Sequence, residues 1–155
     1  MFFAKPSSAS VPIRQLLKET KLSEVMAVPV ITVNEGDEFH VVQEKFNSHD
    51  IRHLPVVDDT GGVIGLITQR DLYKVHSPRK LEDGGLYYDK EMLDNFILKN
   101  VMCKKPFTLR ADNTLEEAMK AMIQSKFGCI PIVDSYRLPV GILTRIDILK
   151  FFLTK

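Results

Sequence analysis

An internal repeat constrains this chain more than any other feature of its sequence. Shifting the sequence by 76 residues aligns Leu22–Val75 with Leu98–Phe151 without a gap. Eleven of the 54 aligned positions are identical, and most of the others keep their apolar character. We therefore expect each half to form one supersecondary unit, and two such units commonly bury their apolar faces together.

Both halves begin with the same expected elements. Short apolar runs at Val30–Val33 and Pro106–Leu109 predict a first strand. Asp37 and Asn113 stand where the N-caps of the following helix are expected, because apolar residues recur after them at helical spacing. Asn113 with Glu116 also matches a capping box, with Asn in place of Ser or Thr.

The rest of each half predicts a hairpin and a second helix. Two apolar runs flank a turn at residues 53–67 and again at residues 129–143. A final helix begins at Thr68 or Thr144. The expected fold class is therefore mixed α/β (α+β), with the order strand, helix, strand, strand, helix in each half.

The repeat also divides the chain into segments. Residues 1–21 are expected to hold an N-terminal segment and most of a leading helix, which is predicted from Pro12 to Glu24 with Ile13, Leu16 and Leu17 on one face. The first repeat spans 22–75 and the second 98–152, followed by a tail at 153–155. Residues 76–97 form a connector with a helical-looking end at Glu91–Leu98, and not a third domain.

Composition restricts the classes of function. With 45% hydrophobic residues among 155, the chain can build a real core. Its formal net charge of +1 provides no cationic field that would concentrate a nucleic acid or an anionic membrane. Cys103 and Cys129 lack the spacing of a zinc site and the density of a disulfide scaffold, which favours a reducing compartment. No secretory signal or membrane-spanning run is readable, so we expect a cytoplasmic protein with no membrane partner.

A Thr-x-x-Asp motif follows a glycine-containing strand in both halves, at Thr68–Asp71 and Thr144–Asp147. One interpretation is a helix cap, in which the hydroxyl and the carboxylate satisfy free backbone N–H groups. The other is a ligand site, because a helix N-terminus suits a phosphate and an Asp one turn later can chelate the vicinal hydroxyls of a ribose. Capping alone would accept Ser for Thr and Glu for Asp, and neither copy uses that freedom.

Taken together, the repeated motifs resemble the CBS domain. The resemblance rests on Val25-Met26 and Val101-Met102 at the start of the halves, on Leu54–Asp58 and Ile130–Asp134 in their middle, and on Gly-x-x-Thr-x-x-Asp near each end. Two units in tandem resemble a CBS pair, or Bateman module, over about residues 12–152. This implies two β-α-β-β-α repeats related by a pseudo-twofold axis, with clefts between them that bind adenosine-containing ligands such as AMP, ADP, ATP, NAD or S-adenosylmethionine.

The resemblance also implies the residues that bind the ligand. Asp71 and Asp147 would hold the ribose hydroxyls, and Thr68 and Thr144 would contact ribose or phosphate. Adenine contacts map to the first strand of each repeat, where the ordinary alternative is a half-buried strand residue. These candidates are Ile31, Thr32, Phe107 and Thr108, and the dipeptides before each Leu/Ile-Pro add Arg52, His53, Gly128 and Cys129.

The two clefts are expected to be unequal. In the family each cleft tends to combine the Thr-x-x-Asp motif of one repeat with the segment before Leu/Ile-Pro of the other. Arg52 and His53 would then face Asp147, whereas Gly128 and Cys129 would face Asp71. Arg suits a phosphate because its planar guanidinium donates two parallel hydrogen bonds. The ordinary alternative is a solvent-facing Arg beside a hydrogen-bonded His.

Other chemistry matches the sequence poorly. The four histidines show no second ligand at metal spacing, so no metal site is expected. Cys129 is expected to be a core residue, and Cys103 has no positioned base. No nucleophile–base pair or paired carboxylate recurs, so we do not expect an enzyme. Near-zero charge and the absence of aromatics interleaved with basic residues disfavour single-stranded nucleic acid.

The leading hypothesis is a regulatory module that senses an adenosine nucleotide, with or without Mg²⁺, and requires no other cofactor. It would signal to a protein that the sequence does not identify. The alternative is a structural or dimerisation module without a nucleotide, favoured if both motif Asp residues cap their own helices. A homodimer is expected because apolar residues fall all round the last helix. They are Ile146, Ile148, Leu149, Phe151, Phe152 and Leu153.

Overall fold

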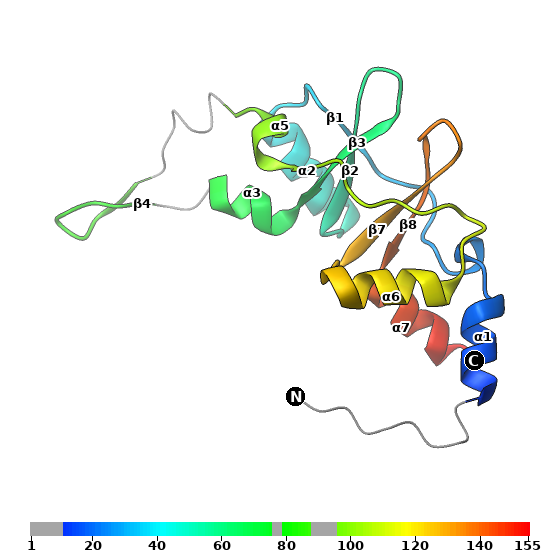
Figure 1. Ribbon diagram of the computed structural model, residues 1–155. Coiled ribbons are helices and arrows are strands. Elements are labelled where there is room, and N and C mark those ends of the chain that lie inside the picture. The colour runs from blue at the N-terminus through cyan, green and yellow to red at the C-terminus, as the bar shows by residue number, and fades with distance from the viewer. Residues whose placement is uncertain (1–10, 76–78, 88–95) are drawn as a thin grey trace. The chain divides into compact units, whose positions relative to one another are not determined.

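The computed structural model describes residues 11–75, 79–87 and 96–155, and these form two compact units (Figure 1). Unit 1 consists of the described residues up to Val30 together with Phe107–Asp134 and Val140–Lys155. Unit 2 joins Ile31–Pro106 to Ser135–Pro139. The units do not coincide with the sequence repeats. The beginning of the first repeat lies in unit 1 with most of the second repeat, and the beginning of the second repeat lies in unit 2 with most of the first.

Unit 2 is built on a four-stranded sheet with the order β1-β2-β3-β6. β1 (Val33–Asn34) runs parallel to β2 (His53–Val57), and β2 forms an antiparallel hairpin with β3 (Val63–Thr68). β6 (Cys103–Lys104) comes from the start of the second repeat and pairs antiparallel with β3. The sheet of the first repeat is thus completed by residues of the second.

Three helices cover the core of unit 2: α2 (Phe39–His49), α3 (Gln69–Val75) and α5 (Leu98–Val101). They bury apolar side chains against the sheet, and Figure 1 shows α5 beside α2 although they are distant in sequence. The fully or nearly buried residues are Val33, Val42, Phe46, Leu54, Val56, Ile67, Leu72, Leu98 and Met102. After α3 the connector forms a small antiparallel hairpin of β4 (Arg79–Lys80) and β5 (Leu86–Tyr87).

Unit 1 repeats the same order of segments with fewer regular strands. β7 (Cys129–Val133) and β8 (Pro139–Thr144) form a two-stranded sheet. Leu109 bridges β7 in parallel through Ile132, and Ala27 bridges β8 in antiparallel fashion through Ile142. These bridges correspond to β1 and β6 of unit 2. Each unit therefore has its own layer of four extended segments, and the last segment of each layer comes from the other repeat.

The helices of unit 1 pack around this layer. α1 (Val11–Glu19) and the short 3₁₀ helix η2 (Leu22–Glu24) precede it, while α6 (Leu115–Ser125) and α7 (Arg145–Leu153) lie against β7 and β8 in Figure 1. The core consists of Leu22, Leu115, Ala118, Met122, Ile130, Ile132, Leu143 and Ile148. The expected mixed α/β fold class is confirmed.

Two of the repeated identities are explained by this exchange of segments. Met26 packs on Gly141 of β8, and Met102 packs on Gly65 of β3. A Cβ atom added to Gly141 would overlap the Met26 sulfur and lie 2.7 Å from its Cγ. The Val-Met and Gly-x-x-Thr motifs are therefore the two sides of one contact, made once in each unit.

The first strand was predicted too long in both repeats. Instead of Val30–Val33, β1 is Val33–Asn34, and it ends where the Asp37 carboxylate accepts a 2.9 Å hydrogen bond from the Asn34 N–H. Within the predicted strand Pro106–Leu109, only Leu109 pairs with a neighbour. The left-handed backbone just before that segment, with φ +49° at Lys105, and the missing N–H of proline explain the loss.

The predicted N-caps were wrong by one residue. The N-caps of α2 and α6 are Glu38 and Thr114, directly after the predicted Asp37 and Asn113. Asn113 instead accepts a 2.8 Å hydrogen bond from a backbone N–H three residues earlier, which closes the turn before α6. The capping box of α6 is accordingly Thr114 with Glu117, and not Asn113 with Glu116.

The leading helix is shorter than Pro12–Glu24. It ends at Glu19: the hydroxyl of buried Thr20 donates to the Leu16 carbonyl at 2.7 Å, and the next residue, Lys21, forms a β-bridge with Thr114 instead of continuing the helix. At the other predicted helix, α5 begins at Leu98, and residues 91–95 lie outside the described residues, as does the start of the chain.

Candidate functional site

The Thr144 motif forms a closed hydrogen-bonded box at the start of α7. The Thr144 hydroxyl donates to Asp147 Oδ2 at 2.8 Å and accepts from the Asp147 N–H at 3.3 Å. The Thr144 N–H donates to the same Oδ2 at 2.8 Å. Because two hydrogen bonds reach its Oδ2, the half-buried carboxylate has a fixed orientation.

The Thr68 motif repeats this geometry at the start of α3. The Thr68 N–H and hydroxyl donate to Asp71 Oδ2 at 2.9 and 2.8 Å, and the hydroxyl accepts from the Asp71 N–H at 3.2 Å. Both Asp residues are therefore helix caps, as one interpretation of the sequence predicted. In each box only Oδ2 is used, and the described residues offer no hydrogen bond to Oδ1. Capping thus leaves one oxygen of each carboxylate for another partner.

The dipeptide Gly128-Cys129 lies beside the motif of unit 1. The Gly128 carbonyl accepts a hydrogen bond from the Arg145 N–H at 3.4 Å, which joins the start of β7 to the start of α7. Cys129 is 5% exposed, and its burial, together with the negative charge of Asp147, raises the pKa of its thiol. Cys129 is therefore a neutral core thiol and a poor nucleophile.

Sequence reasoning missed two residues next to this motif, Phe127 and Arg145. The Phe107 and Phe127 rings stack with centroids 5.6 Å apart and planes 21° from parallel, while Phe107 stays 43% exposed. Arg145 donates through Nη2 to the Phe127 carbonyl at 3.2 Å. These contacts connect the aromatic pair to the residue that follows Thr144. The sequence signal that could have identified Phe127 is its position directly before the candidate dipeptide Gly128-Cys129.

In unit 2 the corresponding dipeptide is Arg52-His53. His53 pairs with Thr68 across β2 and β3, so the two side chains share a face of the sheet. The Arg52 carbonyl accepts a hydrogen bond from the Gln69 N–H at 3.0 Å, and the Arg52 side chain is exposed. Within unit 2 the basic dipeptide is thus a neighbour of the Thr68 motif. That Arg52 and His53 face Asp147 stays a prediction.

The candidate adenine contacts have different surroundings in the two units. Ile31 is half-buried and packs against the core of unit 2. Thr32 is half-buried, and its carbonyl accepts a 2.7 Å hydrogen bond from the Lys45 ammonium. In unit 1 Thr108 is half-buried, whereas Phe107 is exposed. The ligand roles of all four residues stay predictions.

Metal and disulfide chemistry find little support in the described part of the chain. No group of three or more His, Cys, Asp or Glu residues there is placed to hold a metal ion. Cys103 is exposed, Cys129 is buried, and both are free thiols.

Comparison with known sequences gives a consistent family. The CBS domain family model matches residues 22–77 and 98–154. A CBS domain-containing protein of Dictyostelium discoideum is 29% identical over 133 residues, covering 85% of this chain and 90% of that protein. The uncharacterized protein MJ1404 of Methanocaldococcus jannaschii is 30% identical over 139 residues, covering 88% of this chain and 33% of that protein. The L-aspartate semialdehyde sulfurtransferase of the same organism is 27% identical, and the chain spans 23% of it.

Solved structures show the same architecture. The CBS domain pair of protein MJ0100, in complex with 5′-methylthioadenosine and S-adenosyl-L-methionine, has a TM-score of 0.71 at 24% identity and covers 87% of this chain and 97% of its own. CBSX2 in complex with AMP has a TM-score of 0.70 at 21% identity, with coverage of 87% and 97%. Both halves of the sequence match one family model, and the fold is that of a domain pair. The chain therefore belongs to the CBS domain family, as a tandem CBS pair.

Proposed function

We propose that this chain is a regulatory module that binds an adenosine-containing nucleotide through Asp71 and Asp147. The observation that carries the proposal is the shared geometry of the two motifs, in which capping engages Oδ2 and leaves Oδ1 available. A carboxylate held in one orientation is a strong acceptor for two ribose hydroxyls. Related CBS pairs have been solved in complex with AMP, S-adenosyl-L-methionine and 5′-methylthioadenosine, and all three ligands contain adenosine.

The aromatic pair of unit 1 supports an adenine contact there. Phe107 exposes 43% of its surface, and its ring is held by stacking on Phe127. Stacking of a base on an aromatic side chain stabilises binding by about 1–3 kcal/mol. We expect Phe107 to contribute through its ring, and Thr108 through its backbone and hydroxyl. In unit 2 the aliphatic Ile31 and the hydroxyl of Thr32 take these positions.

Phosphate groups and Mg²⁺ belong to the ligand in this proposal. The basic dipeptide Arg52-His53 is the candidate phosphate contact from the family resemblance. The described residues provide no cluster of three metal-binding side chains. Mg²⁺ in proteins often takes one or two carboxylates together with substrate phosphates. It would therefore arrive with a nucleotide polyphosphate.

A second candidate function is a structural module without a nucleotide. The observation that favours it is the same pair of capping boxes, because a complete cap gives each Asp a structural reason to be present. The two functions differ in one respect only. The structural module needs the acceptor oxygen of the cap, whereas the sensor also needs the negative charge and the second oxygen.

The charge requirement makes the two functions separable by experiment. Asn at 71 or 147 keeps an oxygen that accepts the capping hydrogen bonds and loses the charge, whereas Ala loses both. A thermal-shift screen with AMP, ADP, ATP, NAD and S-adenosylmethionine identifies the ligand, since a ligand at 100 times its Kd adds about 2.7 kcal/mol of apparent stability. We expect that shift in the parent and its loss in D71N/D147N, whose unliganded melting temperature stays near that of the parent. A full shift in D71N/D147N, or no shift with any ligand in the parent, supports the structural module.

We also propose a homodimer formed through the α6 and α7 surface of unit 1. A groove of about 470 Å³ lies between these helices, with apolar lining from Met119, Met122, Ile123, Ile148 and Leu149. Ile123 and Leu149 are 75% and 60% exposed. A self-complementary twofold contact is the default for such a patch. Sedimentation at micromolar concentration should give twice the chain mass of 17.7 kDa for the parent. The L149K variant should sediment with the mass of a single chain. A monomeric parent would refute the dimer.

The remaining expectations concern the setting of the module. We propose that it performs no catalysis, that it acts on a separate regulated protein and that it resides in the cytoplasm. The free thiols at Cys103 and Cys129 support a reducing compartment. In the described part of the chain, no helix has the length and apolar character to cross a membrane. Incubation of ATP with stoichiometric protein tests for catalysis, and release of phosphate that follows the purified protein would refute this part of the proposal.

A further inference from the structure

Unit 2 contains a hollow at the start of β3, the end of the strand that is remote from the Thr68 motif. Its volume is about 650 Å³, within the range of small-molecule sites. It lies beside Val63 and Ile64, at the start of β3, whereas Thr68 ends that strand. At about 3.3 Å per residue the two places are roughly 15 Å apart. The hollow is therefore separate from the Asp71 carboxylate.

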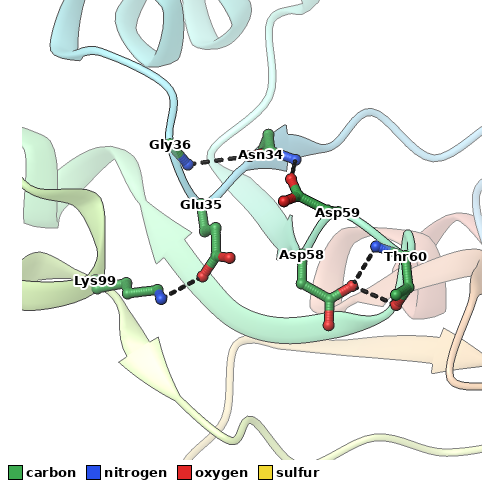
Figure 2. A network of polar contacts seen from close by, with 7 residues as sticks. All are labelled: Asn34, Glu35, Gly36, Asp58, Asp59, Thr60 and Lys99. Atoms are coloured by element: carbon green, nitrogen blue, oxygen red, sulfur yellow. Dashed lines mark hydrogen bonds and ion pairs between the residues drawn. The ribbon is translucent and has the colours of Figure 1, made fainter.

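Four cationic residues line this hollow: Lys99, Lys104, Lys105 and Arg137. Figure 2 shows that Lys99 is directed at Glu35, with its Nζ 2.6 Å from the carboxylate. In the described part of the chain, the other three have no carboxylate within 4.0 Å. The chain carries a formal net charge of +1, so three uncompensated cations in one hollow are a marked local excess.

Nearby carboxylates already have other partners. In Figure 2, Asp58 Oδ1 accepts hydrogen bonds from the Thr60 N–H and hydroxyl, at 2.9 and 2.5 Å. Asp59 accepts from the Asn34 side chain at 3.5 Å. These contacts hold both Asp residues within the β2–β3 turn. Among the described residues, Lys104, Lys105 and Arg137 therefore have no ion-pair partner and are available for an external anion.

The backbone fixes two of these cationic residues against β3. Lys105 and Arg137 both have left-handed backbones, with φ of +49° and +64°, which is uncommon for residues other than glycine. The Lys105 N–H donates to the Ile64 carbonyl at 3.2 Å. Arg137 accepts from the Val63 N–H at 3.0 Å and donates through Nη2 to the Val63 carbonyl at 3.1 Å. The same strand therefore holds the Arg137 side chain and the Lys105 main chain beside the hollow before any ligand arrives.

We propose that this hollow binds an oligophosphate, held by Lys104, Lys105 and Arg137. Several cations converging on one place favour a ligand with several adjacent negative charges, and the Arg fork suits phosphate oxygens. Among the described residues the Arg137 guanidinium donates only to the Val63 carbonyl, so its other donors can serve the ligand. The oligophosphate is either a free inorganic chain or the phosphate chain of a nucleotide. This inference does not rest on the Asp motifs.

The test uses sodium tripolyphosphate as the probe, in calorimetric titrations at constant ionic strength. The main variant is K104Q/K105N, because both side chains are exposed and asparagine tolerates a left-handed backbone. The matched control is K18Q/K74Q, which removes two exposed helix lysines that do not line the hollow. We expect tripolyphosphate to bind the parent, to bind K104Q/K105N at least tenfold more weakly and to bind the control within twofold of the parent.

Two further measurements make the result decisive. Amide signals of Ile64, Lys104 and Lys105 should shift in nuclear magnetic resonance spectra when tripolyphosphate is added, in the parent and in D71N/D147N alike. ATP binding that persists in D71N/D147N and is lost with K104Q/K105N assigns the site to a nucleotide chain, whereas binding of tripolyphosphate alone assigns it to a free oligophosphate. The proposal is overturned if tripolyphosphate fails to bind at millimolar concentration, if control and main variants lose affinity equally or if D71N/D147N abolishes tripolyphosphate binding.

Discussion

The two units share a scaffold and differ in the side chains beside their Thr-x-x-Asp motifs. Unit 1 places the stacked pair Phe107 and Phe127 there, while the corresponding positions of unit 2 are Ile31 and Ile51. Before the hairpin, unit 1 has Gly128-Cys129 and unit 2 has the basic Arg52-His53. Packing and capping residues are thus repeated, and the proposed recognition residues are not. This difference is the basis of our proposal that the two motifs serve unequal sites.

The units also differ in how tightly the exchanged methionine packs on its glycine. A Cβ on Gly141 would meet Met26 at Cγ and Cβ, atoms close to the backbone, at 2.7 and 3.1 Å. A Cβ on Gly65 would meet Met102 at Cε and Cγ, at 3.0 and 3.1 Å, besides the sulfur. The outer atoms of a Met side chain can move aside by rotation about its side-chain bonds, whereas Cβ, which only the Gly141 contact involves, cannot move without the main chain.

The largest expected effect therefore comes from G141A. We expect it to lower the free energy of unfolding by about 2–3 kcal/mol, the upper part of the range for overpacked cores, and G65A to cost about 1 kcal/mol. Urea unfolding followed by circular dichroism measures both. Adding M26A should recover part of the loss in G141A, although M26A alone is destabilising. Equal losses for the two glycine variants would show that the units pack alike.

A smaller effect is expected at the aromatic pair. F107L removes a ring that would stack on adenine and keeps an apolar side chain, so we expect about tenfold weaker nucleotide binding, equivalent to about 1.4 kcal/mol. I31L, its counterpart in unit 2, should change affinity less than twofold. Calorimetry with the ligand found in the thermal-shift screen measures both. If F107L binds like the parent, the aromatic pair is a packing feature alone.

The smallest expected difference between the units is in the free energy of unfolding that is lost when the caps of α6 and α2 are removed. Thr114 caps α6 with its hydroxyl, while Glu38 at the start of α2 makes no side-chain cap. T114A should therefore cost about 1 kcal/mol and E38A a few tenths. The Thr114 N–H, followed by the Asn113 side chain, donates to Glu117 and lowers the pKa of that carboxyl below its usual 4.5. A lowered folded pKa means that this stabilisation is present above pH 4.5 and is lost as the pH falls through the folded value.

The pH dependence offers a separate check of the α6 cap. Urea midpoints measured between pH 6 and pH 3 should fall less steeply in E117Q than in the parent, because the variant has lost the titrating group. The difference is a few tenths of a kcal/mol, since Glu117 lies on the surface. Parallel curves for parent and variant would contradict the assignment of the cap to Glu117.

The sequence predicted the elements whose signals are repeated and local. The hairpin at His53–Thr68 and the helix that follows Thr144 were found because apolar alternation and a cap are visible in short windows. The Thr-x-x-Asp caps were predicted for the same reason. The repeat itself indicated which residues pack, since Val-Met and Gly-x-x-Thr occur twice.

The remaining features depend on contacts that no short window contains. The exchange of Met26 and Met102 between repeats joins segments more than 35 residues apart, so the repeat boundaries did not reveal the compact units. Phe127 lacks a motif of its own, and its role follows from stacking on Phe107. The left-handed backbone of Lys105, directly before the predicted strand Pro106–Leu109, was equally invisible in the sequence.

The central claim is that Asp71 and Asp147 each support a nucleotide site of different affinity. Calorimetric titration of the parent, D71N and D147N with the ligand from the thermal-shift screen tests it directly. The account predicts two unequal binding events in the parent, and in each variant the loss or at least tenfold weakening of one event, a different one in each. Titration curves of D71N and D147N that both match the parent would contradict the claim.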